Sequence, residues 1–131
     1  MMNRKMGDDH MNVNESAENY LETILILSKK LPVVRSVDIA NELGFKKSSV
    51  SIAMKNLREK EHITVTDAGF IYLTDSGKEI AEMIYERHEL ISHWLISLGV
   101  PADIATEDAC KIEHVISKES FDAIKKHENL S

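Results

Sequence analysis

The sequence predicts a mainly α-helical protein that begins with a winged helix-turn-helix and continues as an all-helical second part. Three observations predict this fold class. Apolar residues recur at helical spacing along most of the 131 residues, two helical stretches are separated by a short turn containing glycine, and one stretch of alternating apolar residues follows them. The hydrophobic fraction of 43% is ordinary for a folded chain, so disorder is not expected.

The first predicted helix lies in "NESAENYLETILILSKK", with Asn14 or Ser16 available as its N-cap and Pro32 just beyond its end. Its apolar positions recur three and four residues apart and define one buried face. These positions are Ala17, Tyr20, Leu21, Ile24, Leu25 and Leu27. The preceding residues, 1–14, are expected to form a flexible N-terminus.

A helix-turn-helix is predicted next. Ser36 caps "VDIANEL", "GF" forms the turn, and "KKSSVSIAMKNLREKEHI" resumes the helical pattern. The side chains expected to point inward are Val37, Ile39, Ala40, Leu43, Val50, Ala53, Met54 and Leu57. The following stretch, "ITVTDAGFIYLT", alternates apolar and polar residues around a turn at Asp67 to Gly69, which predicts a β-hairpin, the wing. Its apolar side chains are Ile63, Val65, Phe70 or Ile71, and Leu73.

The second part is predicted to consist of helices only. Thr74 or Asp75 caps a long helix over roughly 76–98, which Gly99 and Pro101 end. Its apolar stripe comprises Ile80, Met83, Ile84, Leu90, Ile91, Trp94, Leu95 and Leu98. The stretch "ADIATEDACKIEHVI" is expected to be helical throughout, and a last helix follows in "KESFDAIKKH", with Ser117 as its cap. The expected domains are therefore 15–75, the winged helix-turn-helix, and 76–131, the helical part.

The distribution of charge favours DNA binding by the middle of the chain. The net charge is −6, yet residues 28–75 carry 8 basic and 6 acidic side chains. Local charge decides whether a protein binds phosphates, and the start of the second helix of a helix-turn-helix reaches base edges and phosphates. The candidate DNA-binding residues there are Lys46, Lys47, Ser48, Ser49, Ser51, Ile52 and Lys55. Lysines neutralise phosphates, hydroxyls allow close approach, and Ile52 could contact a thymine methyl group.

The stretch "EDACKIEHVIS" contains three residues that can each bind a metal ion. Cys110, Glu113 and His114 lie at i, i+3 and i+4, on one face of any helix that they share. Further ligands are available in "YERHELISHW", with His88, Glu89 and His93, and in "NYLETI", with Asn19 and Glu22 one turn apart. Imidazole and carboxylate suit Mn²⁺ or Fe²⁺, and a thiolate moves the preference toward softer ions. On the pattern alone, a metal site and an acidic helix with a buried cysteine both stay open.

The order of these motifs resembles that of a known family. "ENYLETI", "VDIANELGFKKSSVSIAMKNL", the wing, "YERHEL" and "EDACKIEHVIS" are together similar to the diphtheria toxin repressor family of metal-dependent transcription regulators. The resemblance covers about residues 15–127, and "ACKIEHVIS" is its most specific part. It implies a DNA-binding winged helix-turn-helix and a helical domain that binds metal and dimerises. The chain stops after that domain, so it resembles the shorter manganese transport regulator branch, without an SH3-like third domain.

Transferred position by position, the resemblance implies five metal ligands: Glu22, His88, Cys110, Glu113 and His114. Asn19 is a sixth candidate, where the manganese branch has aspartate and the iron branch methionine. Cys110 matches the iron branch, so we expect Fe²⁺ to be preferred, Mn²⁺ to be the alternative, and Co²⁺, Ni²⁺ or Zn²⁺ to bind in vitro. Because Thr106 and Ser92 occupy two positions of the iron branch's second site, one principal site is expected. Affinity should rise with pH, since imidazole and thiol ligands must lose their protons.

The resemblance also implies a repressor of metal-homeostasis genes, whose homodimer binds a palindromic double-stranded operator when metal is bound. The alternatives are a winged-helix regulator that senses an organic ligand, and one that senses oxidation of Cys110. An enzyme is not expected, because no HExxH or other catalytic metal motif is found. With no signal peptide and no run of 18 apolar residues, the expected location is the cytoplasm.

Overall fold

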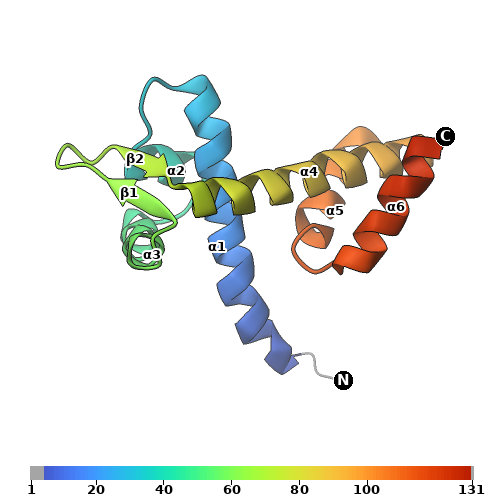
Figure 1. The fold of residues 1–131 in the computed structure, drawn as a ribbon, viewed down its shortest axis with the longest axis horizontal. Helices are drawn as coiled ribbons and strands as arrows, with labels where there is room; N and C mark the ends of the chain where they lie inside the picture. Colours follow the sequence, from blue (N-terminus) through green and yellow to red (C-terminus); the bar gives the residue numbers. More distant parts are fainter. Residues whose placement is uncertain (1–4, 131) are drawn as a thin grey trace. The chain divides into compact units, whose positions relative to one another are not determined.

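The structure is a computed structural model that describes residues 5–130, with side chains described from 15 to 129. Within that range the chain is mainly helical, with one two-stranded sheet, and the predicted fold class is confirmed (Figure 1). The elements are α1 (Lys5–Lys30), α2 (Ser36–Leu43), α3 (Lys47–Glu59), β1 (Ile63–Val65), β2 (Ile71–Leu73), α4 (Asp75–Ser97), α5 (Ala102–Ile112) and α6 (Lys118–Leu130). The chain forms two compact units, and the boundary falls between Glu82 and Met83, inside α4. No helix in the described range is both long and apolar enough to cross a membrane.

Helix α1 forms much of the core of the first unit. Its buried apolar side chains are Tyr20, Leu21, Ile24, Leu25 and Leu27, all from the predicted apolar face. The predicted caps are wrong, because the helix begins at Lys5 and Asn14 and Ser16 lie inside it. Of the expected flexible segment, residues 1–4 lie outside the described range and the rest belongs to α1.

Helices α2 and α3 form the predicted helix-turn-helix. Gly44 ends α2 with φ of 69°, a left-handed conformation that glycine adopts without steric cost. The N-cap of α2 is Arg35, not Ser36, and the Asp38 carboxylate accepts a hydrogen bond from the backbone N–H of Arg35 at 2.9 Å. Val37 was expected to point inward but is 39% exposed, because it lies on the opposite side of α2 from Ile39.

The wing is an antiparallel pair of short strands in which Thr64 lies opposite Tyr72. Its turn is closed by a hydrogen bond from the Gly69 N–H to the Thr66 carbonyl. Ile63 and Ile71 face the core and are buried, as their alternation predicts. The hairpin leads directly into α4, which Thr74 caps through a 3.3 Å hydrogen bond from the Gly77 N–H to its hydroxyl oxygen.

The second unit contains the rest of α4 together with α5 and α6 (Figure 1). One residue from each helix makes its buried centre: Ile91, Ala109 and Phe121. Leu90, Leu95, Ile112 and Ile116 pack around them. Ser117 caps α6 as predicted, accepting a hydrogen bond from the Ser120 N–H at 3.0 Å.

Two members of the apolar stripe predicted for α4 are exposed. Met83 is 40% exposed, since it is turned about 100° from its buried neighbour Ile84 on a helix of 3.6 residues per turn. Leu98 is 65% exposed, because α4 ends at Ser97 and Leu98 lies beyond the helix.

Candidate functional site

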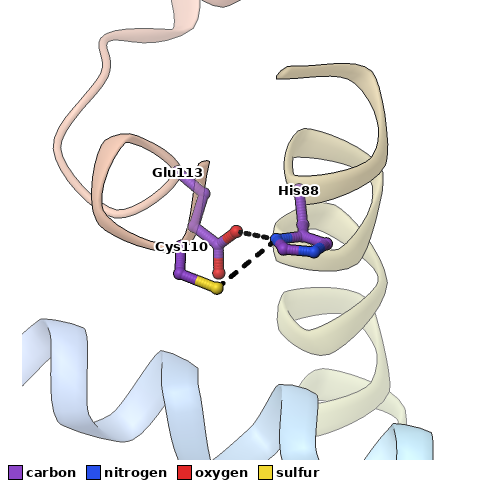
Figure 2. Close-up of side chains that lie close together, drawn as sticks. All are labelled: His88, Cys110 and Glu113. Carbon is purple, nitrogen blue, oxygen red and sulfur yellow. Dashed lines mark hydrogen bonds and ion pairs between the residues drawn. The ribbon is translucent and has the colours of Figure 1, made fainter. Parts of the chain in front are cut away.

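Three of the predicted metal ligands meet in the second unit. His88 lies on α4, Cys110 lies in the last turn of α5, and Glu113 directly follows α5; their side chains point toward one another (Figure 2). The His88 Nδ1 atom is 2.9 Å from Glu113 Oε1 and 3.8 Å from Cys110 Sγ. All three ligand atoms lie within 4.8 Å of one another. We refer to His88, Cys110 and Glu113 as the ligand cluster.

Glu113 is the most deeply buried member of the ligand cluster, with 1% of its surface exposed. A buried carboxylate requires compensating hydrogen bonds or positive charge. Besides the hydrogen bond to His88, its second oxygen, Oε2, lies 3.3 Å from His114 Nε2. His114 is therefore linked to the ligand cluster through Glu113, and its side chain is 7% exposed.

The local backbone explains how the ligand cluster forms, and it corrects one prediction. Helix α5 ends at Ile112, so the expected helix through His114 and beyond is wrong. Glu113 keeps right-handed helical angles as the C-cap, and its N–H donates to the Ala109 carbonyl at 3.0 Å. Cys110 and Glu113 therefore keep their i, i+3 relation. The chain then turns, because the N–H groups of Val115 and Ile116 both donate to the Ile112 carbonyl.

The donor atoms of the ligand cluster fit a divalent transition metal. They comprise one imidazole nitrogen, one sulfur and one carboxylate oxygen, contributed by two separate helical segments. Such a mixed set suits Fe²⁺, Co²⁺, Ni²⁺ or Zn²⁺, whereas Mg²⁺ and Ca²⁺ prefer oxygen ligands only.

The remaining metal candidates are not members of the ligand cluster. Glu22 and Asn19 lie on α1 in the first unit, where Glu22 is 7% exposed and the backbone carbonyl of Asn19 accepts a hydrogen bond from Thr23 Oγ1. Glu89 and His93 are exposed on α4 and do not join the ligand cluster. In the part of the chain that the structure describes, no second group of three such side chains comes as close together.

The candidate DNA-binding residues all lie on one exposed surface of the first unit. Lys46 is the N-cap of α3, and the other six lie on the helix itself. The exposed side chains are those of Lys46, Lys47, Ser48, Ser49, Ser51, Ile52 and Lys55. The opposite face of α3 is anchored by three buried side chains: Val50, Met54 and Leu57. The N-cap side chain of α3, Lys46, makes no capping hydrogen bond, and the first N–H groups of a helix are a common binding site for anions such as phosphate. Ile52 is 63% exposed, so its apolar side chain is accessible on the surface of the first unit.

Two residues near these sites were missed by the sequence analysis. Arg87, which precedes His88, donates hydrogen bonds to main-chain carbonyls of the turn after α5. Gly77 lets the first turn of α4 pack directly on the main chain at His62. For Arg87, the sequence offered one weak signal, which is that it precedes a candidate ligand histidine in "ERHE". No sequence pattern indicated the second.

Comparison with known proteins places both units in one kind of regulator. Residues 12–68 match the N-terminal DNA binding domain of the iron dependent repressor, and residues 74–128 match its metal binding and dimerisation domain. The transcriptional regulator MntR of Escherichia coli O6:H1 is 32% identical over 111 residues, which cover 85% of this chain and 72% of that protein. An uncharacterized HTH-type transcriptional regulator of Methanocaldococcus jannaschii is 31% identical over 115 residues, covering 86% of this chain and 92% of that protein.

Solved structures agree with this placement. The manganese regulator SloR superposes with a TM-score of 0.78 at 27% identity, covering 88% of this chain and 54% of that one. A manganese-dependent transcriptional repressor in complex with manganese superposes with a TM-score of 0.80 at 26% identity, and the match covers 88% of this chain and 53% of that one. The chain thus spans about half the length of these two solved proteins.

Proposed function

Since this chain belongs to the diphtheria toxin repressor family of metal-dependent transcription regulators, we propose that it represses genes of iron or manganese homeostasis. A homodimer with bound metal would bind a palindromic operator. The observation that carries the proposal is the ligand cluster, whose three donor atoms lie within 4.8 Å of one another in a chain with a repressor-type DNA-binding domain. Sensing of an organic ligand, or of oxidation alone, has no comparable support.

The proposed ligands are His88, Cys110, Glu113 and His114 in the second unit and Glu22 in the first, with Asn19 as a sixth candidate. The four ligands in the second unit are supported by the short distances between their side-chain atoms. Glu22 is supported by its place in the "ENYLETI" motif and by its burial, since a carboxylate is seldom buried unless it is paired. Bound metal would supply positive charge that compensates these carboxylates and links segments distant in sequence.

The proposed physiological ion is Fe²⁺, with Mn²⁺ as the alternative. The support is Cys110, because thiolate is a soft ligand and Mn²⁺ favours carboxylate, carbonyl and water. Cys110 Sγ lies 3.8 Å from His88 Nδ1, so the sulfur belongs to the same donor set as the imidazole. Two similar solved proteins are described as a manganese regulator and a manganese-dependent repressor, and for this reason Mn²⁺ is kept as the alternative.

In this proposal residues 15–75 read DNA, and residues 76–131 bind metal and dimerise. The recognition helix is α3, whose exposed lysines and serines would contact phosphates while Ile52 reads a thymine methyl group. A dimer must present two recognition helices about one duplex turn apart, roughly 34 Å. Ligands from both units would favour the conformer that brings them together, and a ligand shifts a population only by binding one conformer more tightly.

Replacing Lys47 with alanine should weaken binding to all duplex sequences by a similar factor. Lys47 is exposed in the first turn of α3, where a phosphate contact contributes affinity but no sequence information. The slope of log affinity against log salt should fall by about 1 for each lost phosphate contact. Fluorescence anisotropy over a range of salt concentrations measures both quantities. Lys78→Ala, an exposed lysine on α4, is the matched control, and equal effects of the two substitutions would contradict the assignment of α3.

Replacing Glu22 with glutamine tests whether the first unit contributes a ligand. We expect metal to bind more weakly and to promote DNA binding much less, because a neutral amide is a poorer ligand than a carboxylate. Glu18→Gln, one turn earlier on α1, removes the same charge at a position outside the proposed set and should change neither property. The readouts are metal affinity and metal-dependent anisotropy of DNA selected from a random duplex library. If Glu22→Gln behaved like Glu18→Gln, the coupling of the two units through Glu22 would be wrong.

A further inference from the structure

Arg87 precedes His88 on α4 and contacts the turn that follows α5. Its Nη1 atom donates hydrogen bonds to the carbonyl oxygens of Glu113 and Ile116, each at 3.1 Å. The guanidinium carbon lies 5.5 Å from the centroid of the Phe121 ring on α6, within the range of a cation–π contact. A single side chain of α4 thus contacts both the turn and the helix after it.

These contacts mean that two consecutive residues of α4 hold opposite ends of Glu113. The Arg87 guanidinium binds its main-chain carbonyl, and the His88 imidazole binds its carboxylate at 2.9 Å. The last carbonyls of an α-helix lack partners within the helix, and a positive charge there is also favoured by the helix dipole. Without Arg87, the Glu113 and Ile116 carbonyls would lose this charged donor, and the turn would be held by its main-chain hydrogen bonds to Ala109 and Ile112 without it.

We infer that Arg87 is a positioning residue of the metal centre, one that fixes the backbone of Glu113 so that its carboxylate stays within reach of His88 and Cys110. The inference rests on the proposed function, because it concerns the same ligands. The hydrogen bonds that Arg87 donates to the turn go to carbonyl oxygens, and a guanidinium, which has no acceptor atom, supplies no ligand to a metal. Arginine suits this role better than lysine, since its planar guanidinium is rigid and can stack on Phe121 while it donates.

The neighbouring residue provides a matched control. Glu86 forms an ion pair with Lys125 that also joins α4 to α6, but both side chains are about half exposed and their hydrogen bond joins them to each other. An exposed ion pair of this kind contributes little to stability. Glu86→Gln therefore changes a charge at the adjacent position while leaving the carbonyl contacts of Arg87 intact.

The experiment compares Co²⁺ binding by the full-length wild type, Arg87→Gln, Arg87→Lys and Glu86→Gln under anaerobic conditions. Titrations give the affinity, and the sulfur-to-cobalt charge-transfer absorption reports ligation by Cys110. Thermal unfolding without metal reports the purely structural effect. We expect Arg87→Gln to bind Co²⁺ about 10- to 100-fold more weakly, as is typical when the partner of a metal ligand is lost. The Co²⁺ affinity of Arg87→Lys should lie between those of Arg87→Gln and the wild type, and the affinity of Glu86→Gln should stay within about twofold of the wild type.

A structural role alone would lower the unfolding temperature of Arg87→Gln but leave the Co²⁺ affinity and absorption of the folded protein like those of Glu86→Gln; that result overturns the inference. If Arg87→Gln does not fold, the Co²⁺ affinity of Arg87→Lys is the deciding measurement. A Co²⁺ affinity equal to that of the wild type in Arg87→Lys would likewise overturn the inference. Failure of the wild type to bind Co²⁺ would instead reject the proposed function, and this inference with it.

Discussion

Replacing His88 with alanine is expected to abolish the response of DNA binding to metal. His88 contributes the one imidazole of the ligand cluster, and its Nδ1 atom lies within 3.8 Å of both the Cys110 sulfur and a Glu113 oxygen. Losing a direct ligand should cost more than losing the partner of a ligand, so metal affinity should fall by more than about 100-fold. Calorimetric titration with metal, together with anisotropy of labelled duplex DNA, measures the two effects.

The same substitution should also affect the metal-free protein. Glu113 is 1% exposed and would lose its 2.9 Å hydrogen bond to His88 while its contact with His114 stays. Loss of a hydrogen-bond partner by a buried group destabilises a fold by about 1–3 kcal/mol. His93→Ala, on the same helix but exposed and outside the ligand cluster, is the control for a lost histidine. If His88→Ala kept the metal affinity of His93→Ala, the ligand cluster would not be the metal centre.

Replacing Gly77 with alanine is expected to destabilise the first unit. A Cβ atom at this position would lie 2.0 Å from the His62 carbonyl oxygen, which belongs to the main chain and also accepts a hydrogen bond from the Thr74 N–H at 3.0 Å. Neither the wing nor the first turn of α4 can move away without breaking that contact. We expect a loss of about 3 kcal/mol, the upper end of the usual cost of overpacking.

The direction of this effect is informative, because alanine in place of glycine in a helix interior usually stabilises by about 1 kcal/mol. Urea unfolding of Gly77→Ala measures the change in free energy, and Lys78→Ala, exposed at the next position, serves as the control. Unchanged or increased stability of Gly77→Ala would show that the wing and α4 do not pack as closely as described.

Much of the fold was predictable because local chemistry determines it. The helix-turn-helix follows from the turn at Gly44, and the caps at Thr74 and Ser117 follow from hydroxyl side chains placed before helical patterns. The predicted N-cap of α2 was wrong, because two residues near its start carry capping side chains. Ser36 looked like a cap, yet the Asp38 carboxylate reaches the backbone of Arg35 and moves the cap one residue earlier.

The site was only partly predictable for a related reason. The i, i+3 spacing of Cys110 and Glu113 indicated a shared face, but the end of α5 at Ile112 depends on the turn that follows, which spacing cannot reveal. That His88 lies opposite them depends on how α4 packs on α5. The residue types alone offered His88, Glu89 and His93 as candidates, and the family resemblance singled out His88. Arg87 escaped notice because its partners are main-chain carbonyls, which leave no pattern of side chains. The role of Glu22 stays a prediction.

The most direct test of the account is a titration of DNA binding with metal. The full-length protein and a duplex selected from a random library would be titrated anaerobically with Fe²⁺, Mn²⁺ and Zn²⁺, beside a sample held in chelator. We expect the protein to bind DNA weakly in chelator and strongly with metal, with Fe²⁺ acting at a lower free concentration than Mn²⁺, because the site contains a thiolate. DNA binding of equal strength in chelator and in every metal would contradict it.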